Sequence, residues 1–515
     1  MKLSKGNRDL ILHGSLVKAV FAIAIPVVVN SFLQTMYNLT DTYWLGQLSV
    51  DYLAAINLVS PVQNTVINFG SGVTVAGAVM ISQYIGAGKP EMARKIANQI
   101  FTVAMLFSLL CASVMAVATP GIVGWMGAAP DYFDHAVTYM RLVVLDMPFL
   151  FMVNIYQSIR QAQGDTVRPM LLNLLGIAVN MVLDPLLMVV LHWNAAGAAL
   201  ATVFAKMVPA CIAFFLLCTR RDEAICFDRR FLRPDAACLR DIVRIGLPTA
   251  LGSSFMQFGF ILMSRNVNVY GKMAMAAYGI GNKVNGLISL PSTGIGSAVS
   301  TIVAQNMGAQ QVDRAERGYK LSTGMAFLFL LLGGFVLSRP SVASAIVSIF
   351  TDEAEVIPMA ADYLSIMAFW CWTNSIHDAT RGLFQGSGHT FLPVAVDMTR
   401  LWVLRFATLA FCEQVLHLGV RSVWYSVVVS NGIASAILLV LYFTGIWRKS
   451  TIKIHDQKRL RALFFLAFCR FPTKIRFLPT ESRFLYYFQM RMRQDAPRIF
   501  VFWLTRMKRS VAALR

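Results

Sequence analysis

The residues best suited to chemistry are carboxylates and amides that lie inside long apolar stretches. Asp184 lies in the run Asn180-Met-Val-Leu-Asp184-Pro185, and Asn180, four residues earlier, shares its helix face. Pro185 frees a backbone carbonyl one turn back, which adds another oxygen ligand. An ionisable group at the centre of a bilayer costs about 2.5–3.5 kcal/mol. The sequence therefore predicts a functional role for Asp184, or at least a structural pairing.

A second polar stretch ends at Asp41. Gln34, Tyr37 and Asp41 lie on one face of the predicted first helix. Thr202, in a later apolar stretch, could add a hydroxyl. Two carboxylates with amide and hydroxyl oxygens suit a site for H⁺ or Na⁺, since burial and mutual repulsion favour proton loading near neutral pH. The alternative is that Asp41 ends its helix in water.

The second half of the chain carries a different polar set, which lies in two neighbouring apolar stretches: His377, Asp378, Arg381, Asp397, Arg400 and Arg405. Asp378 with Arg381, and Asp397 with Arg400, are spaced for pairing along a helix. These residues are either structural ion pairs or a polar patch that lines a substrate cavity.

The elements that position these residues are duplicated. Pro26 and Pro248 are 222 residues apart, and so are Gln83-x-x-Gly86 and Gln305-x-x-Gly308. The matches fall on positions where backbone geometry dictates the residue. The acids are not repeated, because Met263 and Thr408 stand where the first half has Asp41 and Asp184. Pro26 is also a natural bend point for the first helix.

The composition is that of an integral membrane protein. The chain is 57% hydrophobic and 14% charged, whereas a soluble protein is about 25% charged. Twelve stretches are long enough to span a bilayer as helices: 16–40, 53–82, 96–118, 136–163, 168–191, 195–218, 242–268, 275–303, 319–338, 361–386, 392–414 and 420–446. We predict an all-α fold of two parallel six-helix lobes, since six spans per repeat bring both halves into the membrane from the same side.

Basic residues predict the orientation and the domain boundaries. Lys and Arg gather in the N-terminal segment and in the loops near 86–95, 219–241 and 308–320. Both termini are therefore predicted to be cytoplasmic, in the inner (cytoplasmic) membrane of a cell. The predicted domains are an N-terminal lobe, an interlobe loop, a C-terminal lobe and a basic tail: 1–218, 219–241, 242–448 and 449–515.

The high pI is largely a property of the tail. The segment from Lys458 onward contains 14 Lys and Arg and two acidic residues, which gives +12 of the formal net charge of +20. The tail either lies on the anionic leaflet or is an appendage without function, and we predict no nucleic-acid partner. We find no P-loop and no nucleophile–base constellation, so we predict a transporter and not an enzyme. No cofactor is expected beyond the coupling ion.

Over residues 10–448 the chain resembles the multidrug and toxic compound extrusion (MATE) family. The resemblance rests on Pro26 and on six motifs: Asn38-Leu-Thr-Asp41-Thr-Tyr-Trp-Leu-Gly46, Leu53-Ala-Ala, Gln83-Tyr-Ile-Gly86-Ala-Gly, Gln305-Asn-Met-Gly308-Ala-Gln, Gln161-Ala-Gln-Gly164-Asp-Thr and Gln385-Gly386. It implies a V-shaped pair of six-helix bundles around a central cleft, exporting small organic cations or amphipathic compounds by antiport against H⁺ or Na⁺.

The resemblance also implies a site. In the DinF-like branch, the family's ion-coupling residues map onto Asp41, Asn180, Asp184 and Thr202, with Gln34, Tyr37 and Asn154 nearby. In the NorM-like branch, a Glu stands eight residues after the seventh-span proline. Met256 occupies that position here, which argues against Na⁺ coupling of that type in the second lobe. We expect a monomer in the lipid bilayer.

Two other functions stay open from the sequence. A flippase for lipid-linked precursors or polysaccharides would need a large cationic cavity, for which Arg381, Arg400 and Arg405 are the in-span candidates. A membrane receptor without transport would leave the pairing of Asp41 with Asp184 without a purpose.

Overall fold

The computed structural model is all-helical throughout the part of the chain that it describes. These residues are 8–48, 50–126, 130–219 and 225–452, without the side chains of 38–61, 69, 130–132, 189, 194, 195, 229, 258 and 261. The chain divides into two compact units, residues 1–454 and 455–515. The second unit, which holds the predicted basic tail, lies outside the described residues.

The first half of the chain forms long apolar helices, several of which begin at a proline or end at a glycine. Pro90 starts one of them, at a position where a missing N–H costs nothing. The elements are α2 (Leu16–Leu48), α3 (Val50–Gly86), α4 (Pro90–Trp125), α5 (Pro130–Val143), η1 (Val144–Asp146), α6 (Met147–Ala162), α7 (Val167–Pro185), η2 (Leu186–Val190) and α8 (Asn194–Thr219).

The second half repeats this pattern with more interruptions. Its elements are η3 (Arg229–Phe231), α9 (Ala236–Asn268), α10 (Lys272–Gly308), α11 (Val312–Leu337), α12 (Pro340–Val347), α13 (Val356–Trp370), α14 (Trp372–Gly386), α15 (Phe391–Met398), η4 (Thr399–Leu404), α16 (Arg405–Gln414), α17 (Arg421–Phe443) and η5 (Ile446–Arg448). Both η2 and η4 are π-helices.

Each of the twelve predicted spans overlaps these helices. Among the described residues, ten helices are long and apolar enough to cross a membrane, and α13 with α14, bent by 53° at their junction, makes up to eleven. The predicted span 392–414 corresponds to the succession α15, η4 and α16. The π-helix η4 breaks that span into short pieces, so no single helix there reaches spanning length.

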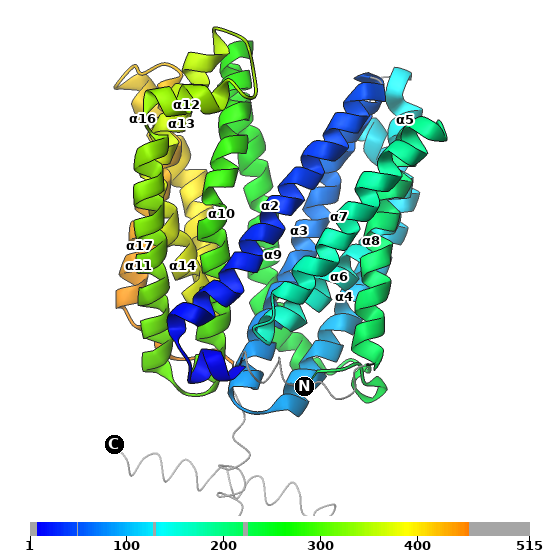
Figure 1. Cartoon of the computed structure of the whole chain (residues 1–515), viewed down its shortest axis with the longest axis vertical. Coiled ribbons are helices and arrows are strands. Elements are labelled where there is room, and N and C mark those ends of the chain that lie inside the picture. The colour runs from blue at the N-terminus through cyan, green and yellow to red at the C-terminus, as the bar shows by residue number, and fades with distance from the viewer. Residues whose placement is uncertain (1–7, 49, 127–129, 220–224, 453–515) are drawn as a thin grey trace, which may run out of the picture. The chain divides into compact units, whose positions relative to one another are not determined.

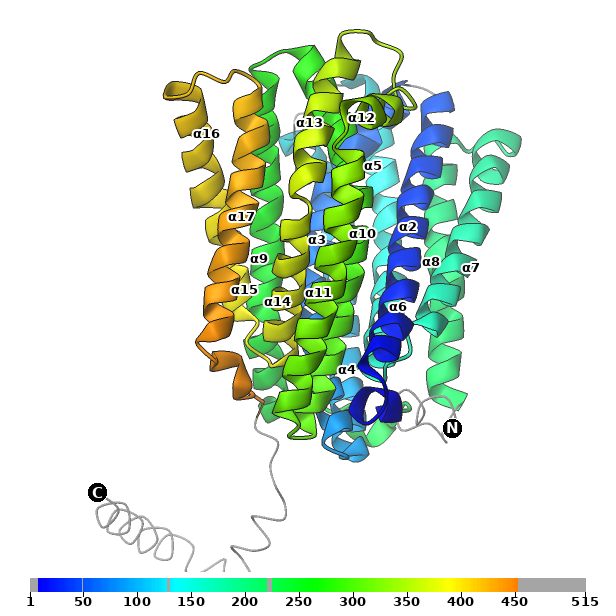
Figure 2. The same ribbon diagram turned by 60° about the vertical axis from the view of Figure 1, so that its left-hand side comes forward.

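The helices of unit 1–454 form two bundles, one from each half of the chain (Figure 1). α3 packs along α9, and α10 packs along both α2 and α3. The bundles approach each other at one end and diverge at the other. α2 runs obliquely between them, from beside α11 at the lower end toward α5 at the upper end (Figures 1 and 2).

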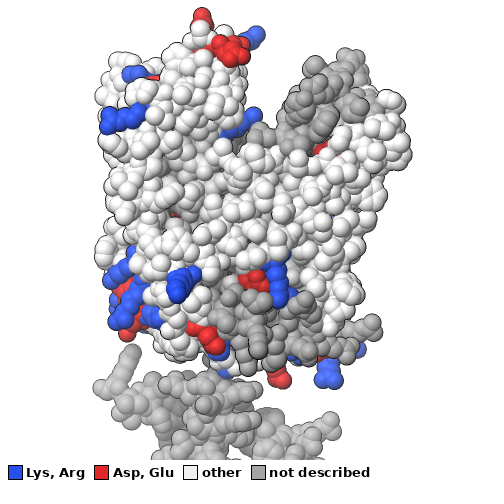
Figure 3. Space-filling model, viewed as in Figure 1, with Lys and Arg blue, Asp and Glu red and all other residues white. Residues whose placement is uncertain are grey.

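The surface of this unit is apolar between two charged ends (Figure 3). Large side chains such as Leu110, Val117 and Phe329 are exposed on the helices, which is typical of helices that face lipid. At the lower end, Glu316 pairs with Lys320 on its own helix α11 and with Arg448 on η5. We call the end that carries the loop residues 86–90, 225–236 and 308–312 the basic end.

At the basic end, the two halves of the chain hold each other through reciprocal contacts. Gln83 Nε2 on α3 donates to the carbonyl of Gly386 at 2.8 Å, and Gln305 Nε2 on α10 donates to the carbonyl of Ala162 at 2.7 Å. Each repeat-related glutamine thus bonds a backbone group of the other half. We call these two contacts, with Gly86 and Gly308 described next, the basic-end latch.

The glycines of the latch allow the two helix ends to touch. A Cβ on Gly86 would overlap the Gln305 carbonyl, and a Cβ on Gly308 would overlap that of Gln83. This close approach explains why both Gln-x-x-Gly motifs need glycine.

The segment 449–452, which the sequence boundary assigned to the tail, packs against the basic end. The Ser450 hydroxyl donates to Gln83 Oε1 at 2.7 Å, and the Thr451 N–H donates to the Ser387 carbonyl at 3.3 Å. Ile452 is buried in the same hydrophobic cluster as Ile155 and Tyr156. The helical unit therefore extends past residue 448.

Candidate ion-coupling and substrate site

The acid and the amide predicted on the fifth span lie together in the interior. Asn180 and Asp184 on α7 are both 0% exposed. Asn180 Nδ2 donates to Asp184 Oδ1 at 3.1 Å, as the four-residue spacing predicts. The helix turns into the π-helix η2 directly after Pro185. Single π-turns inside helices are frequent at functional sites.

The predicted partner Asp41 lies on α2, and its side chain is outside the described residues. α2 packs against α7, and α7 against α8, which carries the half-buried Thr202. These helix contacts are compatible with one site formed by Asp41, Asp184 and Thr202. Whether the oxygens of these residues converge on one ion stays a prediction.

Next to these helices lies a polar cavity of about 120 Å³. It is lined by α2, α6, α7 and α8, and it brings together the three residues Gln34, Tyr37 and Asn154 that the sequence placed near the ion site. Further lining residues were not predicted from the sequence: Asn30, Gln157, Asn173 and Lys206. Amide groups dominate the polar part of the wall, and they can both donate and accept hydrogen bonds.

Lys206 is the most consequential of the residues that sequence reasoning missed. Its ammonium lies over the ring of Tyr37, 5.1 Å from the centroid, inside the cavity wall. Its positive charge also acts on Asp146, which is buried where η1 meets α6. Each is an ionisable residue inside a predicted span, so a complete search for such residues would have found both.

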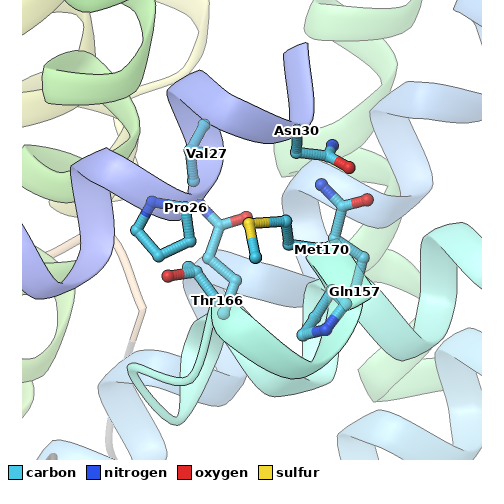
Figure 4. A pocket seen from close by; sticks show the side chains of 8 residues that line it. Pro26, Val27, Asn30, Gln157, Thr166 and Met170 are labelled. Atoms are coloured by element: carbon cyan, nitrogen blue, oxygen red, sulfur yellow. The ribbon is translucent and has the colours of Figure 1, made fainter. Parts of the chain in front are cut away.

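The bend point Pro26 lines a separate small pocket, which shares Asn30 and Gln157 with the polar cavity (Figure 4). Pro26 has no N–H, so the carbonyl of Ala22 loses its helical donor. The Thr166 hydroxyl, after the turn that ends α6, lies 3.2 Å from the carbonyls of Ala22 and of Ile23. Asn30 and Gln157 present their amides at the opposite side of the pocket.

The second half repeats this arrangement around Pro248. The Thr390 hydroxyl donates to the carbonyl of Ile245 at 2.7 Å. Both threonines follow a tight turn that requires a glycine at positive φ, Gly164 at 80° and Gly388 at 89°.

The charged residues of the second half form one buried cluster. Arg400 lies 3.3 Å from Asp397, as their spacing predicts, but Arg381 also lies nearest to Asp397, at 3.8 Å. Asp378 instead accepts a hydrogen bond from Ser292 at 2.6 Å. The charge of Arg381 still acts on Asp378, but the direct contacts of the two residues are with Asp397 on α15 and Ser292 on α10.

Arg405 turns away from these acids. Its guanidinium bonds Asn431 at 3.1 Å and Ser430 at 3.3 Å, both on α17. Met263, which replaces Asp41 in the repeat, is fully buried against apolar and aromatic side chains. The second half therefore has a packed core at the position where the first half has its acid.

The fold and the polar cavity between its helices define the class of a multi-pass membrane transporter. More narrowly, the chain belongs to the MatE family, whose model matches residues 26–186 and 248–410. The two matched segments begin at the repeat-related prolines, and the match confirms the resemblance to the MATE family.

Known proteins similar to this chain support the same assignment. It is 25% identical to the probable multidrug resistance protein YoeA of Bacillus subtilis (strain 168), over 83% of this chain and 93% of that protein. It is 22% identical to the multidrug export protein MepA of Staphylococcus haemolyticus (strain JCSC1435), over 84% and 94%. A crystal structure of MATE in complex with MaL6 matches with a TM-score of 0.80 and 25% identity, covering 85% of this chain and 98% of that one.

Proposed function

We propose that this protein exports small organic compounds, cationic or amphipathic, across the cytoplasmic membrane in exchange for H⁺ or Na⁺. The observation that carries the proposal is the fully buried Asp184, bonded to Asn180 on α7, a helix that also lines the amide-rich cavity. A buried carboxylate in a membrane helix is costly, and such residues commonly mark the pathway of an ion or a proton. The relatives named multidrug export and resistance proteins support the direction and the substrate class.

The coupling residues of this proposal are Asp41, Asn180, Asp184 and Thr202. The same set resembles the DinF-like branch of the family, and α2, α7 and α8, which carry it, pack together. Loading of a proton or Na⁺ would neutralise the carboxylates, and Pro26 would let α2 bend and reshape the cavity. One elementary charge that crosses 100 mV supplies about 2.3 kcal/mol, enough to bias such a switch.

We further propose that the basic end faces the cytoplasm, which follows from the excess of Lys and Arg in its loops. Both termini would then be cytoplasmic, and the monomer would be the transporting unit. The two lobes would correspond to residues 1–218 and 242–448.

The decisive experiment is ethidium efflux from proteoliposomes under separately imposed pH and Na⁺ gradients. Asp41→Asn and Asp184→Asn should each reduce gradient-driven efflux to the level of empty liposomes. Asp313→Asn, the same change on an exposed carboxylate of α11, serves as the matched control. Normal gradient-driven efflux in both site variants would contradict the proposal.

The observed contacts disfavour a flippase that holds anionic headgroups. The three arginines it would need are engaged, Arg381 and Arg400 by Asp397 and Arg405 by Asn431. A flippase would predict that replacing all three abolishes lipid translocation and leaves dye efflux unaffected.

A further inference from the structure

The buried charge cluster of the second half contains a histidine in an unusual position. On α14, His377 Nδ1 lies 3.4 Å from Asp378 Oδ1, and Nε2 lies 3.0 Å from Asp397 Oδ1. A neutral imidazole carries one N–H, so one of these two contacts would set a lone pair against a carboxylate. An imidazolium carries an N–H on each side and is attracted to both.

We propose that His377 is a proton-binding site of the second half, which holds a proton between Asp378 and Asp397. The proposal rests on the proposed function, because it gives the antiporter a second titratable site apart from Asp41 and Asp184. The proton adds to a ring nitrogen and leaves from it, with no other bond made or broken.

The charges around the ring favour a site that can both take up and release a proton. Asp378 and Asp397 bring two negative charges, and Arg381 and Arg400, which face Asp397, bring two positive ones. The cluster is thus neutral with a neutral ring and gains one positive charge on protonation. Neither oxygen of Asp397 has a partner in hydrogen-bond geometry, so its contacts hold through charge.

The other helices packed against α14 bring few ionisable groups. α10 contributes Ser292, which bonds Asp378, and α11 contributes Tyr319, which bonds Thr380 at 2.8 Å. α17 contributes Asn431, whose side-chain oxygen accepts hydrogen bonds from Arg400 and, on α16, from Arg405. Arg400 is the positive charge that acts against protonation of His377.

The exposure of the cluster gives the proton a path. The side chains of His377 and Asp397 are 6% and 2% exposed, whereas those of Asp378 and Arg381 are 24% and 29% exposed. Asp378 therefore connects the buried ring to the surface of the bundle. In this proposal, Asp378, which contacts the ring and is partly exposed, is the group through which a proton reaches His377.

The site also lies between two helix irregularities. α14 begins at the 53° bend after Trp370, and Asp397 lies two residues before the π-helix η4. Loss of the proton would turn one of the two attractions, to Asp378 on α14 or to Asp397 on α15, into a repulsion. Since α14 packs on α10, and α10 on α2 and α3, a shift at this joint would reach the contact between the two halves.

The direct test is ¹⁵N NMR of the histidines of the full-length protein in lipid nanodiscs. The chain has seven histidines, and the spectrum of His377→Gln identifies the resonance of interest. We expect His377 to show the imidazolium pattern at pH 7. Its protonation midpoint should fall by at least one pH unit in Asp397→Asn and in Asp378→Asn. A neutral single-tautomer pattern from pH 6 to 8, or an unchanged midpoint in both variants, would overturn the proposal.

A transport assay tests the consequence. His377→Gln should shift the pH dependence of ethidium efflux from proteoliposomes, whereas His389→Gln, a half-buried histidine outside the cluster, should not. An unchanged pH profile in His377→Gln would remove its coupling role. The NMR measurement needs no flux, so its failure is distinct from failure of the proposed antiport, which the Asp41 and Asp184 variants test.

Discussion

At the scale of single residues, the first-half cavity combines a fixed cation with neutral amides. Lys206 lies in the wall with its ammonium against Tyr37, and its charge acts on the buried Asp146. A cationic substrate that enters this cavity would meet a like charge. Lys206 is therefore expected to set how strongly the cavity accepts positive compounds.

Lys206→Met should bind ethidium more tightly, by roughly fivefold. Removing a like charge from a partly solvated cavity is worth about 1 kcal/mol. The measurement is a fluorescence titration of the purified protein, with Lys206→Arg as the variant that keeps the charge. Equal or weaker ethidium binding in Lys206→Met would contradict this role.

Asp235 caps the N-terminus of α9 at the basic end, where it also contacts Lys95. The Lys95 ammonium, together with the N–H groups of Ala237 and Cys238, holds the pKa of the Asp235 carboxyl below its ordinary value. A lowered folded-state pKa stabilises the protein above the unfolded value of about 3.9, and the stabilisation is lost as pH falls through the folded value.

Asp235→Asn should therefore lower the thermal unfolding temperature at pH 7 and match the wild type at acidic pH. The effect should be below about 1 kcal/mol, because the pair is partly exposed and asparagine can still cap the helix. Thermal unfolding across pH 3–8 measures it. In a Lys95→Met background, Asp235→Asn should lower the unfolding temperature by less. An equal fall in unfolding temperature at every pH would contradict a role for the Asp235 charge.

At the scale of elements, each repeat contains a proline inside a long helix and a threonine that bonds the backbone just before it. The Thr166 hydroxyl donates to backbone carbonyls of α2 before Pro26, and the Thr390 hydroxyl donates to a backbone carbonyl of α9 before Pro248. The threonine supplies a donor in the region where the proline has removed one. The bend point of α2 is thus tied to the turn between α6 and α7.

Thr166→Val should loosen α2 around Pro26, because valine keeps the shape but leaves buried carbonyls unsatisfied, at about 1–3 kcal/mol. Hydrogen exchange should accelerate in peptides that cover residues 20–32. Thr390→Val is the matched control: it should accelerate exchange near residues 242–252 and leave α2 unchanged. Unchanged exchange in α2 of Thr166→Val would show that this contact does not restrain the helix.

At the scale of the whole helical unit, the basic-end latch holds the two halves of the chain together. Its two glutamines each bond the backbone of the opposite half, and its two glycines let the backbones touch. An antiporter that exposes its cavity alternately to each side would have to open this contact.

Gly86→Ala and Gly308→Ala should each prevent the latch from closing, since the added methyl would overlap a backbone carbonyl that cannot rotate away. We expect longer distances between spin labels at positions 91 and 313 and a loss of ethidium efflux. Gly279→Ala, on the same helix α10 but facing open space, should change neither. Unchanged label distances in both latch variants would contradict the role of the glycines.

The sequence alone was sufficient for the helices, the repeat and the Asn180–Asp184 contact. Apolar length, proline and glycine spacing, and the four-residue period act locally along the chain, so they can be read without the fold. Helix spacing did not predict the direct contacts of Asp378 and Arg381. Asp378 bonds Ser292 on α10, and Arg381 contacts Asp397 on α15.

The tertiary structure decided which polar groups share a cavity and which close a contact between the halves. Lys206 and Asp146 are 60 residues apart in the sequence, and their interaction arises only because α8 packs against η1 and α6. The reciprocal glutamines of the latch, and the placement of His377 between two carboxylates, depend on helix packing in the same way. Local spacing fixes which residues share a helix face, but only packing fixes what that face meets.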